Sequence, residues 1–291
     1  MSAKSLVKPF IFSLVILPVV FAATFNLKGA QAAGAVTMTL FAATVLVELF
    51  ALAQFVRVRR RFAAGDAGHL TWTLIVTFMV VRLLGEGRLL TLTYGLVPEY
   101  NVGSSTGLFV YVAVLRYLYT LSDVLFITAL LTTIRSYKST GLPFKVLPVD
   151  YLYMLAVWTL PVVTYIFRDN LLQTTLGTAD GYVRTFRLVA VTVGAAIVSV
   201  CIVVRRYASQ MGGGAVARVW NMVVVAGVAR DGSFLALALL AGWSKPTASF
   251  VEQYLLWGFS CCWLLAALYQ SAVFSRAIEP APVAVAQSAA G

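Results

Sequence analysis

Charged residues are scarce in this sequence of 291 residues, where Asp, Glu, Lys and Arg together make up 11% and hydrophobic residues 60%. A typical soluble domain has about 25% charged residues, so the composition excludes an ordinary soluble domain. The mean hydropathy is +0.89. Apolar runs of about 18 or more residues are candidate membrane helices, and the chain contains seven or eight of them. Such long, continuous runs are not barrel strands, whose apolar residues alternate with polar ones.

The sequence also lacks the residues that most catalytic and metal centres need. It has one histidine and three cysteines, and Cys201, Cys261 and Cys262 all lie in predicted helices without the spacing of metal ligands. No phosphate loop, Ser/His/Asp arrangement or Asp-rich diphosphate-binding motif occurs, and no lysine lies at mid-membrane for a retinal Schiff base. We therefore expect no metal and no cofactor.

The apolar runs predict an all-α, polytopic transmembrane helical bundle. Residues 33–276 form a predicted seven-helix transmembrane domain, and residues 277–291, rich in Ala, Pro and Val, a disordered cytoplasmic tail. The seven expected helices cover about residues 35–56, 70–97, 107–134, 150–167, 182–204, 217–242 and 250–274.

Residues 1–32 form a further hydrophobic segment with two interpretations. Lys4 and Lys8 precede an apolar run over residues 9–25, and Ala30-Gln31-Ala32 resembles a small-residue cleavage site. The segment is either a signal peptide or an eighth membrane helix. Both alternatives leave the topology of the other seven helices unchanged.

The net charge of +11 follows membrane topology and does not indicate nucleic-acid binding. Lys and Arg concentrate in alternate loops, which the positive-inside rule places in the cytoplasm. The largest group, Arg57, Arg59, Arg60 and Arg61, is expected to attract anionic lipid headgroups. The pattern predicts a multi-pass protein of the plasma membrane or endoplasmic reticulum with a cytoplasmic C-terminus.

Several predicted helices carry a charge near mid-depth, where an ionisable residue costs at least about 2.5–3.5 kcal/mol and marks a candidate functional site. Arg82 and Glu86 share one helix face, as do Arg116 and Asp123. We expect the helices over residues 70–97, 107–134 and 217–242 to pack around a shared polar centre. The candidate ligand-binding or proton-handling residues are Glu48, Arg82, Glu86, Arg116, Asp123, Arg230 and Asp231.

In this set four carboxylates face three guanidinium groups. If all seven are buried together, one carboxylate is left over and is either protonated or open to a cation or a basic ligand group. The alternative is structural, because ion pairs between helices can simply hold a bundle together.

The layout resembles that of fungal seven-helix integral membrane proteins, including the lipid-translocating, aminocholesterol-resistance-like group. The resemblance rests on the topology, on Arg82 in a glycine-containing helix, and on Arg230-Asp231 followed by Glu252-x-Tyr254. It spans most of the last 240 residues, and no functional residue is transferred from it.

Three functional classes remain after these exclusions. A receptor or sensor would bind a small ligand in the polar centre and contact a cytoplasmic protein through its basic loops. A transporter of a small, lipid-like molecule would couple to protons through the unpaired carboxylate. An intramembrane enzyme of terpene-cyclase type would use that carboxylate as a general acid. The lack of catalytic spacing favours the first two classes.

Overall fold

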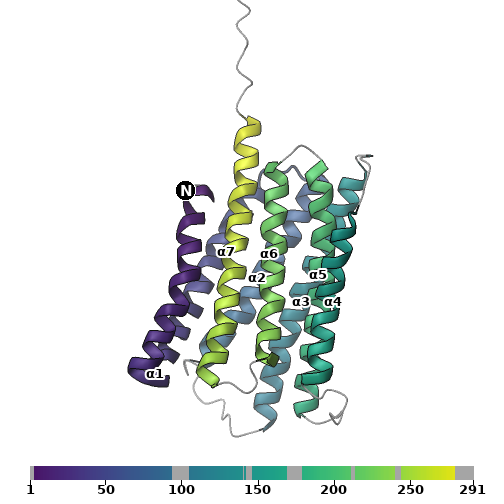
Figure 1. Ribbon diagram of the computed structural model, residues 1–291. Helices are drawn as coiled ribbons and strands as arrows, with labels where there is room; N and C mark the ends of the chain where they lie inside the picture. Colours follow the sequence, from purple (N-terminus) through teal and green to yellow (C-terminus); the bar gives the residue numbers. More distant parts are fainter. Residues whose placement is uncertain are drawn as a thin grey trace, which may run out of the picture.

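The computed structural model describes residues 3–93, 105–139, 141, 146–168, 179–210, 214–239 and 244–278. Within these ranges every regular element is a helix, and the helices run side by side in one bundle (Figure 1). The predicted all-α bundle is thereby confirmed. The helices are α1 (Ala3–Arg59), α2 (Ala67–Thr93), α3 (Ser105–Lys138), α4 (Pro148–Arg168), α5 (Ala179–Gln210), α6 (Gly214–Leu239) and α7 (Lys245–Ile278).

Five stretches of helix in the described part of the chain are long and apolar enough to cross a membrane. A helix satisfies its own backbone hydrogen bonds, so it can span lipid without water. The protein is therefore a multi-pass membrane protein. The five stretches are Ser5–Arg59, Gly68–Gly85, Tyr117–Lys138, Leu188–Gln210 and Pro246–Phe274.

Helix α1 turns back on itself at Gly29, where the backbone leaves helical geometry with φ 82° and ψ −176°. Glycine adopts this positive φ without steric strain. The turn divides α1 into a first arm, residues 3–28, and a second arm, residues 30–59, which lie alongside each other (Figure 1). The two arms correspond to the first two hydrophobic segments of the sequence.

The first arm packs along α7 through both apolar and polar contacts. The rings of Phe21 and Phe250 stack with centroids 4.0 Å apart. The Tyr254 hydroxyl donates to the carbonyl of Leu14 at 2.8 Å. The arm thus covers a face of α7 that would otherwise meet lipid.

We expect the first arm to stay in the mature protein, because it satisfies polar groups of α7 within the membrane. The intact mass of the protein, purified from membranes through a tag at its C-terminus, should include residues 1–32. A mass that corresponds to a chain beginning after Ala32 would support the signal-peptide alternative instead.

One end of the bundle carries most of the basic residues and is called the basic end here. Arg61 Nη1 donates to the carbonyl of Ser271 at 3.4 Å, and Arg206 pairs with Asp150 at 2.6 Å. The first contact joins the C-terminal ends of α1 and α7, and the second joins the C-terminal end of α5 to the start of α4. Which side of the membrane this end faces stays a prediction.

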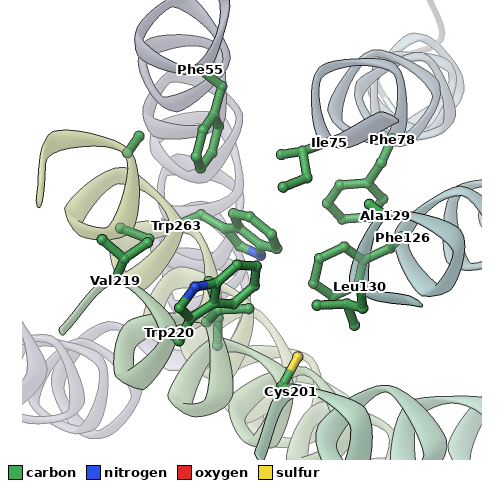
Figure 2. Close-up of a cluster of buried hydrophobic side chains, with 14 of the residues drawn as sticks. Phe55, Ile75, Phe78, Phe126, Ala129, Leu130, Cys201, Val219, Trp220 and Trp263 are labelled. Carbon is green, nitrogen blue, oxygen red and sulfur yellow. The ribbon is translucent and has the colours of Figure 1, made fainter. Parts of the chain in front are cut away.

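The largest apolar core is built around Trp263 of α7. Its ring contacts those of Phe55, Phe78 and Phe126 at centroid distances of 5.4, 5.4 and 5.2 Å. Figure 2 shows Trp263 between Phe55 on one side and Phe78 and Phe126 on the other. We call these four residues the aromatic layer. All four are buried, and they join α1, α2, α3 and α7 across the bundle.

Candidate functional site

Glu48, on the second arm of α1, is fully buried and is held by two neighbouring helices. The Ser260 hydroxyl of α7 donates to Glu48 Oε1 at 2.6 Å. Arg82 Nε of α2 lies 3.4 Å from both Oε1 and Oε2. Charged N–H···O contacts are normally about 2.7–2.9 Å, so this ion pair is loose. Among the described residues, Glu48 Oε2 has no hydrogen-bond donor.

The Arg82 guanidinium also lies against two aromatic rings. Its Cζ is 4.2 Å from the ring centroid of Phe259 on α7 and 6.0 Å from that of Tyr119 on α3. A desolvated guanidinium over a ring is worth about 2 kcal/mol or more. Arg82 therefore connects α1, α2, α3 and α7, and part of its stabilisation does not depend on Glu48.

Asp123 of α3 and Arg230 of α6 form a second, closer pair. Arg230 Nη2 lies 2.6 Å from Asp123 Oδ1 and 2.8 Å from Oδ2. Both residues are buried. Gly227, one turn before Arg230, lets α6 approach α5 closely, since a Cβ there would lie 2.9 Å from Val198 Cγ2.

The two pairs belong to one polar layer, which we define as Glu48, Arg82, Asp123, Arg230 and Ser260. Tyr119, which faces Arg82, precedes Asp123 by one helical turn. Phe259, on which Arg82 stacks, lines a small cavity together with Arg230. The cavity is about 10 Å³, the space that one water needs.

The aromatic layer lies directly on the basic side of the polar layer. Each of its residues is three to seven positions along its helix from a member of the polar layer, always towards the basic end. Such spacings keep two side chains on the same helix face. Four buried rings therefore separate the polar layer from the basic end.

The structure brings four of the seven predicted site residues, Glu48, Arg82, Asp123 and Arg230, into this layer. The side chains of Glu86, Arg116 and Asp231 lie outside the described residues, so the predicted Arg82–Glu86 pair is not tested. The four described charges balance, two against two. Any surplus carboxylate would therefore be Glu86 or Asp231, and that surplus stays a prediction.

Sequence reasoning missed the parts of the site that carry no charge. Ser260, Phe259 and the aromatic layer look like ordinary residues of apolar helices. One signal was available: Phe55 follows Glu48 by seven residues and Phe78 precedes Arg82 by four, which places each ring on the face of a buried charge.

A bidentate pair at the basic end was also not predicted. Arg206 Nε and Nη2 donate to Asp150 at 2.6 and 2.7 Å. The sequence places Asp150 at the start of one helix and Arg206 at the end of the next, so an antiparallel hairpin brings them to the same level. The pair fastens α4 to α5, away from the polar layer.

The arginines predicted to bind lipid headgroups also make contacts within the protein. Arg59 Nε donates to Thr73 Oγ1 at 2.8 Å, and Arg61 reaches the carbonyl of Ser271. Arg57 and Arg60 are exposed. The lipid contact of all four stays a prediction.

The resemblance in layout to fungal seven-helix membrane proteins also stays a prediction. The geometry described above identifies a membrane bundle with a buried, ion-paired layer at mid-depth. Comparisons of the chain with protein-family models, with curated proteins and with solved structures find no match.

Proposed function

We propose that this protein is a receptor- or sensor-like membrane protein whose polar layer responds to a small molecule arriving from the end opposite the basic end. The observation that carries the proposal is the position of the aromatic layer. It closes the polar layer towards the basic end with four buried rings. In sequence, Glu86 lies one helical turn beyond Arg82, and Arg116 lies two turns from Asp123, both in the direction away from the basic end.

The unequal lengths of the two ion pairs suggest how the bundle could change its arrangement when a ligand binds. Asp123–Arg230 is close, at 2.6 Å, and Glu48–Arg82 is loose, at 3.4 Å. A switch needs an element with two arrangements of similar free energy. The close pair holds α3 to α6, while the loose pair lets α1 shift relative to α2 and α3. A ligand that competes for either partner would favour the shifted arrangement.

The positive-inside rule makes the basic end cytoplasmic in this proposal. The ligand then arrives from the outer side, and the C-terminus lies in the cytoplasm. The basic loops at the ends of α1, α3 and α5 would contact a cytoplasmic protein partner.

A transporter of lipid-like molecules is the second candidate, and it needs a path open to both sides in turn. The aromatic layer favours sensing over transport, because four side chains would have to separate for such a path to open. The enzyme alternative is less favoured, because both described carboxylates of the layer, Glu48 and Asp123, face arginines.

The test compares the wild type with Glu48→Gln in lipid nanodiscs, with spin labels at Leu46 on α1 and Leu121 on α3. Both positions are exposed, and the three buried cysteines are replaced by alanine for labelling. We expect one distance in the wild type and a second, longer population in Glu48→Gln, because the neutral amide loses its attraction to Arg82.

The matched control is Thr44→Val, one turn away on the same arm. Thr44 is buried too, but its hydroxyl donates within its own helix, to Leu40 at 2.9 Å. Thr44→Val should leave the distance between the two spin labels unchanged. If Glu48→Gln also leaves the distance unchanged, the layer is a fixed lock. Movement of protons or of a fluorescent lipid analogue above that in protein-free vesicles would favour the transporter.

A further inference from the structure

A groove that opens on the side of the bundle lies between the two arms of α1 and α7. It encloses about 190 Å³, far more than the 10–15 Å³ that one water needs. The first arm contributes Leu6, Pro9, Phe10 and Ser13, the second arm Val47, and α7 Trp257, Cys261, Leu264 and Leu265. All these residues belong to membrane-spanning stretches.

The lining of the groove is almost entirely apolar. Its two hydrogen-bonding side chains satisfy each other, because Trp257 Nε1 donates to Ser13 Oγ at 2.9 Å. Ser13 Oγ in turn donates to the carbonyl of Phe10 at 2.7 Å. Apolar cavities stay dry, so water does not fill this groove. Hydrocarbon is the occupant that its depth and lining favour.

A positively charged side chain, Arg61, lies at the basic end of the surface that contains the groove. Arg61 lies in the turn that follows the second arm, which ends at Arg59. It lies at the basic end of the α7 face that lines the groove, because Ser271 follows Trp257 by 14 residues, almost four helical turns. Arg61 contacts α7 through the carbonyl of Ser271 and lies over the ring of Phe274, with its Cζ 5.9 Å from the centroid. Its side chain is exposed. The guanidinium can therefore meet a phosphate at the membrane surface.

The length of this surface matches one leaflet of a bilayer. Ser271 and Trp257 are 14 residues apart on α7, about 21 Å of helix. A bilayer with its headgroup regions is about 40–45 Å thick, so one leaflet is about 20–22 Å. A headgroup at Arg61 would thus place the far part of an acyl chain beside Trp257.

We propose that this groove binds one anionic phospholipid from the leaflet at the basic end, with an acyl chain between the arms of α1 and α7 and its phosphate at Arg61. The site uses none of the residues of the polar layer. It therefore stands or falls independently of the receptor proposal. It assigns the first arm a role as one wall of a lipid site.

The test is native mass spectrometry of the full chain, released from nanodiscs that contain equal amounts of phosphatidylglycerol and phosphatidylcholine. We expect one phosphatidylglycerol to be retained per chain, several-fold more often than phosphatidylcholine. The same spectrum shows that residues 1–32 are present. Arg61→Gln should remove the preference for phosphatidylglycerol, and Leu264→Trp should reduce retention of both lipids by filling the groove.

The control is Arg135→Gln, an exposed arginine at the end of α3, which should keep the wild-type retention. Equal retention of the two lipids by the wild type would overturn the proposal. So would Arg61→Gln behaving like Arg135→Gln, a result that does not depend on whether Leu264→Trp folds. Detergent found in place of lipid would mean binding of an adventitious additive only.

Discussion

Asp123→Asn is expected to destabilise the folded bundle by about 3–5 kcal/mol, which is the usual effect of removing one partner from a buried ion pair. The variant leaves Arg230 buried without the carboxylate that lies 2.6 Å from its Nη2. Neither group can turn to water, because both side chains are buried in the described bundle. The destabilisation is measured as the difference in the free energy of unfolding between the variant and the wild type, by steric trapping in bicelles.

The double variant Asp123→Asn/Arg230→Gln separates the pair from the general effect of substitution. Without the unpaired cation, it should recover part of the stability that Asp123→Asn loses. A double variant as unstable as the sum of the two single variants would mean that the two charges act independently.

Arg82→Gln is expected to destabilise the bundle by about 2–3 kcal/mol, less than Asp123→Asn, because hydrogen bonds to charged groups contribute about 1.5–3 kcal/mol. Glu48 stays buried in this variant, but it keeps the Ser260 hydroxyl at 2.6 Å. The same unfolding measurement applies.

Arg82→Lys separates the two contributions of this residue. Lysine keeps the positive charge but not the planar group that stacks on Phe259. We expect a loss of about 1 kcal/mol or more from the stacking alone. Stability equal to that of the wild type would show that the planar guanidinium, stacked at 4.2 Å from the Phe259 centroid, adds nothing beyond its charge.

The sequence was sufficient to predict four charges of the buried polar layer, because an ionisable side chain in an apolar run stands out in any membrane helix. Glu48, Arg82, Asp123 and Arg230 were all identified in this way. Their role in a functional site stays a prediction. The pairing was harder to predict. Helical spacing predicted Glu86 as the neighbour of Arg82, and that pair lies outside the described residues. The described partner, Glu48, is 34 residues earlier on another helix, and helical spacing did not indicate it.

Partner choice depends on how helices rotate and pack, and that information is spread over many apolar residues. Gly227, for example, sets the approach of α6 to α5, yet in the sequence it is one of 21 glycines. The turn at Gly29 joins two segments that hydropathy alone places as separate helices. The aromatic layer could not be predicted from the sequence for the same reason, because a phenylalanine in a membrane helix indicates no particular neighbour.

The central claim is that one pair in the polar layer is a lock and the other a loose, movable contact. Its most direct test is the coupling free energy of each pair, from two double-mutant cycles measured in the same bicelles. One cycle uses Asp123→Asn with Arg230→Gln and the other Glu48→Gln with Arg82→Gln. We predict that the coupling between Asp123 and Arg230 exceeds that between Glu48 and Arg82 by at least about 1 kcal/mol. Equal couplings, or a stronger coupling between Glu48 and Arg82, would contradict the account.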